Sequence, residues 1–250
     1  MAATTFGSGP AAPLGHREAM TLAATEFDRM GAQLTALAPT DWVRPTVCEL
    51  WDVREMAAHV LGMAEAQASF RQFAHDFRAA GKRSSGKMID EMSATQVRER
   101  ASMTSTAIIS RLAAVAPKAV RARRRTPALM RRAVRFKNDP PFDSERWPYG
   151  YLVDIIFTRD TWMHRLDISR AADCAMDLTA GHDGRLVADV VTDWALRHAK
   201  PFALTLTGVA GGEWRSGEAG ERLELDALDF CWTVAGRLSG AGLMATQVPF

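Results

Sequence analysis

Apolar residues recur at three- and four-residue spacing in four stretches of the chain, and this period predicts amphipathic helices. In the first stretch Met20 and Phe27 share one face, and Pro39 ends the run. The second begins at Asp52, which can form a capping box with Glu55. The predicted helices cover residues 14–38, 52–80, 94–116 and 149–172. Each has one apolar face to bury, so a helical bundle is expected.

The pattern changes near residue 178. A helix is expected over 183–199, and residues 202–208 alternate between apolar and polar, which predicts a strand. A second strand is expected over 222–225, followed by a helix from Asp226 to Arg237. The predicted fold is therefore mainly α with a smaller α+β part. The expected organisation is a flexible lead-in over 1–13, a helical domain over 14–177 and an α+β domain over 178–250.

The composition is that of an ordinary globular protein, with 47% hydrophobic and 24% charged residues. The net charge of +2 gives no reason to expect nucleic acid or a membrane surface as a partner. Three widely spaced cysteines do not form a disulfide framework and fit a reducing compartment. No signal peptide and no apolar run of membrane-spanning length is visible in the sequence. A cytoplasmic protein is expected.

Three residues on two predicted helices are candidate metal ligands. Asp160 and His164 are four positions apart, so they lie about 40° apart on one helix face. His59 lies among apolar neighbours and should point into the bundle. Two imidazoles and one carboxylate suit Zn²⁺ with a fourth position open for water or substrate. The spacing alone leaves other interpretations open: His59 as a hydrogen-bonded core residue, and Asp160 paired with a neighbouring arginine.

Three ordered motifs add a stronger signal. They are Trp42-x-x-Pro45-Thr46-x-Cys48-x-x-Trp51-x-Val53-x-x-Met56-Ala57-Ala58-His59-Val60-x-Gly62, then Trp162-Met163-His164-Arg165-x-Asp167-Ile168, then Asp226-Ala227-Leu228-Asp229-Phe230 with Gly236-Arg237. Together they resemble the mycothiol-dependent maleylpyruvate isomerase family, which belongs to a wider DinB-like group of metal-binding bundles. The resemblance covers nearly the whole chain.

This resemblance implies a DinB-like four-helix bundle followed by a small α+β C-terminal domain that is similar to sterol-carrier folds. It implies that His59, Asp160 and His164 bind a divalent metal, with zinc favoured and nickel also accepted by these ligands. The family commonly has Glu where this chain has Asp160, so the metal's identity and affinity stay open. Arg237 matches a catalytic arginine of the family, and mycothiol is the implied thiol cosubstrate.

The expected function is a metal-dependent isomerase or S-transferase that uses a low-molecular-weight thiol on a small electrophile. The alternative is a non-catalytic protein of the same fold that binds a small ligand. A nucleic-acid-associated protein is less favoured, because the basic run over 118–137 contains a single aromatic residue, Phe136. We interpret that run as a solvated face or a mobile segment. A monomer without membrane partners is expected.

Two further residues have open interpretations. Cys48 is favoured as a small buried hydrophobe over a nucleophile, because no basic residue adjoins it in the sequence. Asp167 lies three positions after His164 and could either orient that imidazole or pair with Arg170.

Overall fold

The computed structural model describes residues 12–82 and 87–250. Of the lead-in predicted over residues 1–13, only residues 12 and 13 are described, and the rest lies outside the described residues. The chain divides into a helical unit, Gly15–Met176, and a second unit built on Asp177–Phe250. The expected class, mainly α with a smaller α+β part, is confirmed.

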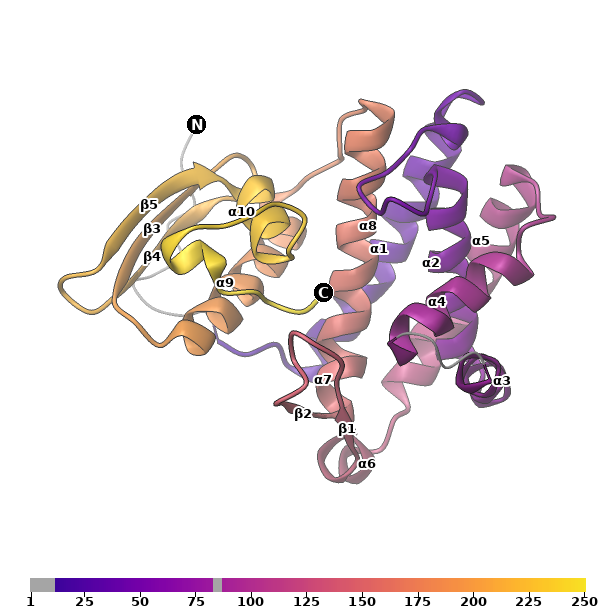
Figure 1. The fold of residues 1–250 in the computed structure, drawn as a ribbon, viewed down its shortest axis with the longest axis horizontal. Coiled ribbons are helices and arrows are strands. Elements are labelled where there is room, and N and C mark those ends of the chain that lie inside the picture. The colour runs from indigo at the N-terminus through magenta and orange to yellow at the C-terminus, as the bar shows by residue number, and fades with distance from the viewer. Residues whose placement is uncertain (1–11, 83–86) are drawn as a thin grey trace. The chain divides into compact units, whose positions relative to one another are not determined.

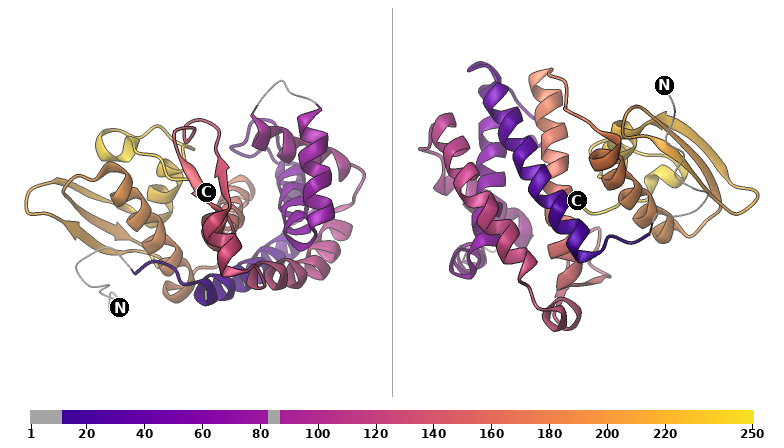
Figure 2. Two further views of the ribbon diagram at one scale, coloured as in Figure 1. Left: turned by 90° about the horizontal axis from the view of Figure 1, so that it is seen from below. Right: turned by 180° about the vertical axis from the view of Figure 1, so that it is seen from behind.

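Four long helices form the bundle of the helical unit (Figure 1). They are α1 (His16–Ala36), α2 (Val53–Ala68), α5 (Ser105–Arg124) and α8 (Phe157–Ala172). Helix α1 packs against α5 and α8, and α2 packs against the same two helices (Figure 2). Buried apolar residues from all four, such as Met20, Met56, Leu112 and Ile168, form one core. Burial of these faces holds α2 and α8 side by side.

The second predicted helix, 52–80, is in fact two helices. Helix α2 ends at Ala68, and α3 (Phe70–Gly81) starts in a new direction after Ser69, whose backbone is extended. The Ser69 side chain accepts a hydrogen bond from the backbone N–H of Gln72 and caps α3. The prediction of one helix was wrong because no Gly or Pro marks this break.

The third predicted helix, 94–116, merged the end of one helix with the start of another. Helix α4 (Met88–Glu99) packs back on α2 and α3, and a short connection leads to α5. Thr104 caps α5 by accepting a hydrogen bond from the Ala107 N–H. Pro117 does not end α5, which continues to Arg124. Helices α3 and α4 thus form an excursion between the second and third helices of the bundle.

The basic run over 118–137 forms regular structure with most of its basic residues exposed, which agrees with its interpretation as a solvated face. Its first part is the end of α5, and α6 (Ala128–Ala133) and strand β1 (Arg135–Lys137) follow. Strand β1 pairs antiparallel with β2 (Arg146–Pro148). Arg123 is buried and Arg131 pairs with Asp154 at 2.7 Å, whereas most of the other basic residues are exposed.

The fourth predicted helix, 149–172, is confirmed as a continuous helical run. It consists of α7 (Tyr149–Tyr151), a π turn η2 (Leu152–Ile156) and α8. Asp154 in the π turn accepts from His16 and Arg131, both at 2.7 Å.

The second unit contains a three-stranded sheet with helices packed on it. The order is β4-β3-β5, in which β3 is antiparallel to β4 and parallel to β5. Trp194 lies against Phe202 and Phe230 and forms the centre of its core. Strands β3 and β5 match the predicted ones, whereas β4 was not predicted. The elements are η3 (Ala180–Gly184), α9 (Arg185–His198), β3 (Phe202–Thr207), β4 (Gly212–Ser216), β5 (Glu221–Asp226), α10 (Ala227–Val234) and η4 (Gly242–Ala245).

Two short features complete the description. The 3-10 turn η1 (Asp41–Val43) lies in the Trp- and Pro-rich loop before α2. Within residues 12–82 and 87–250, every helix is too short or too polar to span a lipid bilayer.

Candidate metal centre

The three candidate ligands come from two neighbouring helices of the bundle. Helix α2 begins with the predicted capping box, in which Asp52 and Glu55 bond reciprocally to each other's backbone N–H. The carboxylate of Glu55 therefore has a structural role as part of the helix cap. One turn further on, His59 is buried and directed at α8. Asp160 and His164 lie on successive turns of α8, as their spacing predicts.

The three side chains meet at one point. Nε2 of His164 is 3.4 Å from Oδ1 of Asp160, and Nε2 of His59 is 3.9 Å from Oδ2 of Asp160. The two imidazole rings are edge to face, with centroids 5.1 Å apart. All three residues can offer one ligand atom within 4.8 Å of the others. Two ligand atoms on a tetrahedral zinc lie about 3.4 Å apart, so the spacing suits one ion.

Each imidazole is held from behind by a second side chain. Nδ1 of His164 donates to Oδ2 of Asp167 at 3.2 Å. Of the two roles considered for Asp167, this contact is the one that orients the imidazole. Nδ1 of His59 donates to Oε1 of Gln96 at 3.0 Å. A hydrogen on Nδ1 leaves the lone pair of a neutral imidazole on Nε2. Both Nε2 atoms therefore face the convergence point as ligand atoms.

The charges of the cluster are strongly coupled. Burial favours a neutral Asp160, but the imidazoles of His164 and His59 outweigh it and hold the pKa of this carboxyl well below its usual range. Burial likewise favours a neutral His164, but the carboxylates of Asp160 and Asp167 raise its pKa to about 9. Without a metal, an imidazolium–carboxylate pair therefore occupies the site at neutral pH.

One buried oxygen of the cluster has no hydrogen-bond donor among the described residues. Oδ2 of Asp160 is buried and accepts no hydrogen bond from any described residue. A buried carboxylate oxygen without a donor is costly, and a bound cation would satisfy it. The Trp51 ring lies over the two imidazoles, 5.0 Å from His59 and 6.4 Å from His164 between centroids. The donor set, the orphaned oxygen and this apolar cover fit a metal ion.

Comparison with known proteins supplies the family. Residues 23–169 match the domain described as the mycothiol maleylpyruvate isomerase N-terminal domain. The chain belongs to this family. The match covers more than half of the chain and includes His59, Asp160 and His164. The resemblance inferred from the motifs is confirmed.

Two solved structures share the fold of this mycothiol maleylpyruvate isomerase family member. One is the crystal structure of the mycothiol-dependent maleylpyruvate isomerase, 15% identical, with a TM-score of 0.56 over 90% of this chain and 91% of that chain. The other is a histidine-to-alanine mutant of the mycothiol-dependent maleylpyruvate isomerase, 14% identical, with the same TM-score and coverage. A comparison with curated proteins gives no match. At these identities the likeness shows a common fold.

Arg237 lies in the second unit, directly after α10. Gly236 adopts a left-handed conformation, with φ of 79°, and ends the helix in a Schellman motif. Nη1 of Arg237 donates to the Ala235 carbonyl at 3.5 Å, a contact that a helix-capping role also explains. Its catalytic role stays a prediction.

Two members of the site environment were not predicted from the sequence. Gln96 is wholly buried and reaches His59 from α4, and Asp76 on α3 lies behind it. In the sequence they would appear only as polar residues on otherwise apolar helix faces. Such residues are also common in protein cores that have no binding function. Cys48 is half-buried and packs against the bundle core, which agrees with its predicted packing role.

Proposed function

We propose that His59, Asp160 and His164 bind a divalent metal ion, and that the protein uses it with mycothiol or a similar thiol to transform a small electrophile. Family membership supports the class of thiol, and the site geometry supports the metal. The observation that carries the proposal is the convergence of two imidazoles, each hydrogen-bonded through Nδ1, on a carboxylate with a buried oxygen that accepts no hydrogen bond from the described residues.

The ligand set leaves room for catalysis. Three protein ligands on a tetrahedral metal leave a fourth position for a water, thiol or substrate. A cation bound there would lower the pKa of an incoming thiol and favour the nucleophilic thiolate. Asp167 and Gln96 fix the orientation of the two imidazoles, and the Trp51 ring lies beside both of them. These contacts hold the ligands in place around the ion.

The reaction that follows depends on the electrophile. The thiolate adds to an electrophilic carbon, and the carbanion formed is stabilised by the activating carbonyl group of the substrate. If the thiol leaves after rotation about the former cis double bond, the protein is an isomerase. If the carbanion is protonated and the adduct is released, the protein is an S-transferase.

Zinc is the metal we propose first, with nickel as the second choice. Imidazole and carboxylate ligands accept both. The motif resemblance leads one to expect a glutamate at position 160, and Asp160 is one methylene shorter. The metal affinity of this chain can therefore differ from that of family members with glutamate. The proposed setting is the cytoplasm, where the thiol pool is reduced.

The experiment follows both the conversion of the substrate and the loss of free thiol, because an isomerase regenerates the thiol and only an S-transferase consumes it. Purified protein is assayed with mycothiol against a panel of α,β-unsaturated acids, including maleylpyruvate, and metal content is measured on the same sample. We expect about one zinc per chain and turnover that chelators abolish and zinc restores. Metal and thiol binding without turnover on any substrate would instead identify a non-catalytic binder. A protein that takes up neither zinc nor nickel would contradict the proposal.

Arg237 is the proposed anchor for a substrate carboxylate, through its guanidinium fork. We expect Arg237→Met to keep metal content and the unfolding midpoint but to lower kcat/KM for anionic substrates at least tenfold. The matched control is Arg222→Met on strand β5 of the same unit, which should leave turnover unchanged. If kcat/KM is unchanged in Arg237→Met, or falls only in step with stability, the capping role is sufficient.

A further inference from the structure

The α3–α4 excursion reaches the proposed metal site through one side chain. Gln96 on α4 is wholly buried, and its Oε1 accepts the Nδ1–H of His59. No covalent or local constraint requires this contact, because the two residues are 37 positions apart. The excursion therefore has a structural connection to the ligand set that the bundle alone does not provide.

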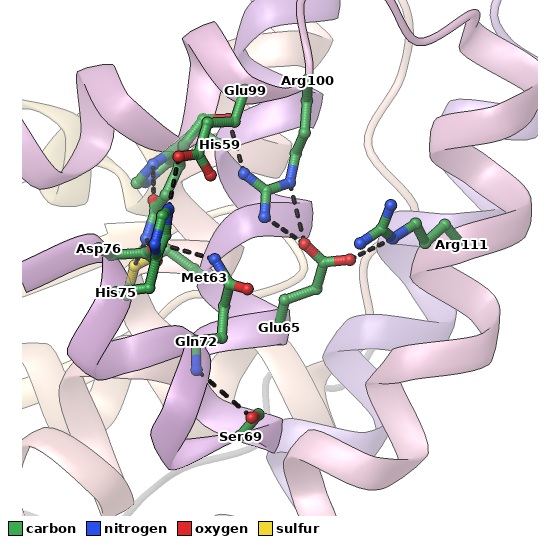
Figure 3. A network of polar contacts seen from close by, with 11 residues as sticks. His59, Met63, Glu65, Ser69, Gln72, His75, Asp76, Glu99, Arg100 and Arg111 are labelled. Carbon is green, nitrogen blue, oxygen red and sulfur yellow. Dashed lines mark hydrogen bonds and ion pairs between the residues drawn. The ribbon is translucent and has the colours of Figure 1, made fainter. Parts of the chain in front are cut away.

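The Gln96 amide has a fixed orientation. Its Nε2 donates to Oδ2 of Asp76 at 3.2 Å and lies 3.5 Å from Sδ of Met63. Both groups are acceptors, so the amide nitrogen must face them and the amide oxygen must face His59. Asp76 is itself held by Gln72, whose Nε2 donates to Oδ1 at 2.8 Å (Figure 3). His59 thus donates to Gln96 and Gln96 donates to Asp76, which also accepts from Gln72, so the direction of each hydrogen bond is fixed.

The backbone is arranged to permit this contact. A Cβ added at Gly62 would lie 2.6 Å from Cβ of Gln96, so glycine lets α4 approach α2 closely. Arg100, which follows α4 directly, forms a buried ion pair with Glu65 on α2 and donates to the Gln96 carbonyl at 2.7 Å. Ser69 ends α2 so that α3 can bring Asp76 behind the amide. These features hold Gln96 in place from three directions.

We propose that Gln96 and Asp76 are positioning residues that fix His59 as the Nδ1–H tautomer and aim its Nε2 at the metal. The proposal rests on the proposed metal site for its purpose, but the hydrogen-bond chain exists independently of an ion. An imidazole with its free nitrogen already directed at the ion binds without losing rotamer freedom or changing tautomer.

The test compares variants by zinc affinity, measured in competition with a chelator. Gln96→Leu removes the acceptor and is expected to weaken zinc binding about 10- to 100-fold. Thr95→Val is the matched control, because Thr95 is a buried neighbour on α4 whose hydroxyl bonds to Glu91 and Arg98 and not to the site. Equal affinities for the two variants would overturn the proposal.

A reversed pair gives a second test that keeps side-chain size. Gln96→Glu alone sets two carboxylates against each other, because its new oxygen replaces the nitrogen that faces Asp76. Adding Asp76→Asn restores a donor to that contact, while its amide oxygen still accepts from Gln72. We expect the single Gln96→Glu variant to lose affinity and the double variant to recover most of it. A double variant that binds zinc no more tightly than Gln96→Glu would contradict the proposed role of the hydrogen-bond chain.

The hydrogen-bond chain can also be tested in metal-free protein, which separates it from the proposed function. Nitrogen-15 NMR identifies the tautomer of the neutral His59 ring. We expect the Nδ1–H form in the parent and a shift towards the Nε2–H form in Gln96→Leu. If the parent binds no zinc but the tautomer changes in this way, the metal proposal fails and the role of Gln96 in fixing His59 stands. If His59 keeps the same tautomer in both proteins, that role of Gln96 is refuted.

Discussion

The two halves of the candidate site are built in different ways. On α8, one helix supplies two ligands and the carboxylate that orients one of them: Asp160, His164 and Asp167 span eight positions. On α2, His59 depends on an amide and a carboxylate from two other helices. The α8 half forms wherever the helix forms, whereas the α2 half forms only when α3 and α4 have docked. Disturbing the excursion should therefore affect one ligand and spare the other two.

The largest effect is expected from removing an α8 ligand. His164→Ala should lose most bound zinc, a greater loss than the roughly 10- to 100-fold expected for an orienting partner. Asp160→Glu should retain zinc, since it keeps a carboxylate on the same helix face. Metal analysis after dialysis measures both. His75→Ala, which changes an exposed imidazole on α3, is the control. Zinc binding by His164→Ala at the parent level would refute the ligand assignment.

The next effect concerns pH and the charge on His164. Its pKa of about 9 means that zinc must displace a proton at neutral pH. Asp160 stays ionised throughout, because its pKa is lowered. Zinc affinity should therefore rise by nearly tenfold per pH unit below the pKa, or about 50-fold from pH 7 to 9, and then level off. Isothermal titration in several buffers would measure both the affinity and the proton release.

Metal-free protein should show the opposite trend. A histidine whose pKa is raised on folding adds stability that is complete below its unfolded pKa of about 6.5 and is lost as pH rises through about 9. The unfolding midpoint of metal-free protein should thus fall between pH 7 and 9. Asp167→Asn should move both pH profiles to lower pH. Flat profiles would show that the α8 half is not the charged pair described above.

A smaller effect tests the close approach of α4 to α2. Gly62→Ala forces the new Cβ against Gln96, and we expect destabilisation of about 1–3 kcal/mol and weaker zinc binding. Gly31→Ala in α1 is the matched control, because its Cβ meets nothing within 4 Å and should stabilise the helix slightly. Urea unfolding measures both. Equal stability in the two variants would mean that α4 can shift without cost.

The smallest effect is expected at the start of the excursion. Ser69→Ala removes the cap of α3 and should cost about 1 kcal/mol. Faster amide hydrogen exchange should appear in α3 and not in α8. Exchange that speeds up equally in both helices would show that the two halves of the site are not independent.

The same contrast explains what could be predicted from the sequence. The helical period predicted the bundle, and the four-residue spacing placed Asp160 and His164 on one face because both belong to a single helix. Gln96 could not be assigned to His59, because their contact depends on how α4 folds back. The break at Ser69 was missed because no Gly or Pro accompanies it, although serine favours a helix cap over a helix interior. The predicted end at residue 116 was too early, because α5 continues through the exposed Pro117 to Arg124.

The π turn at Leu152–Ile156 determines where the sequence can gain or lose a residue without moving the metal ligands. It separates the ligand-bearing helix from the segment that enters it from the β1–β2 hairpin. Deleting one residue there would convert the turn to α-helix and rotate the preceding segment by about 100° relative to α8. Asp154 would lose His16 and Arg131, while Asp160 and His164 would keep their register with α2. A one-residue insertion or deletion within Leu152–Ile156 should therefore leave the metal ligands of α8 in register, whereas one between Asp160 and His164 would separate them.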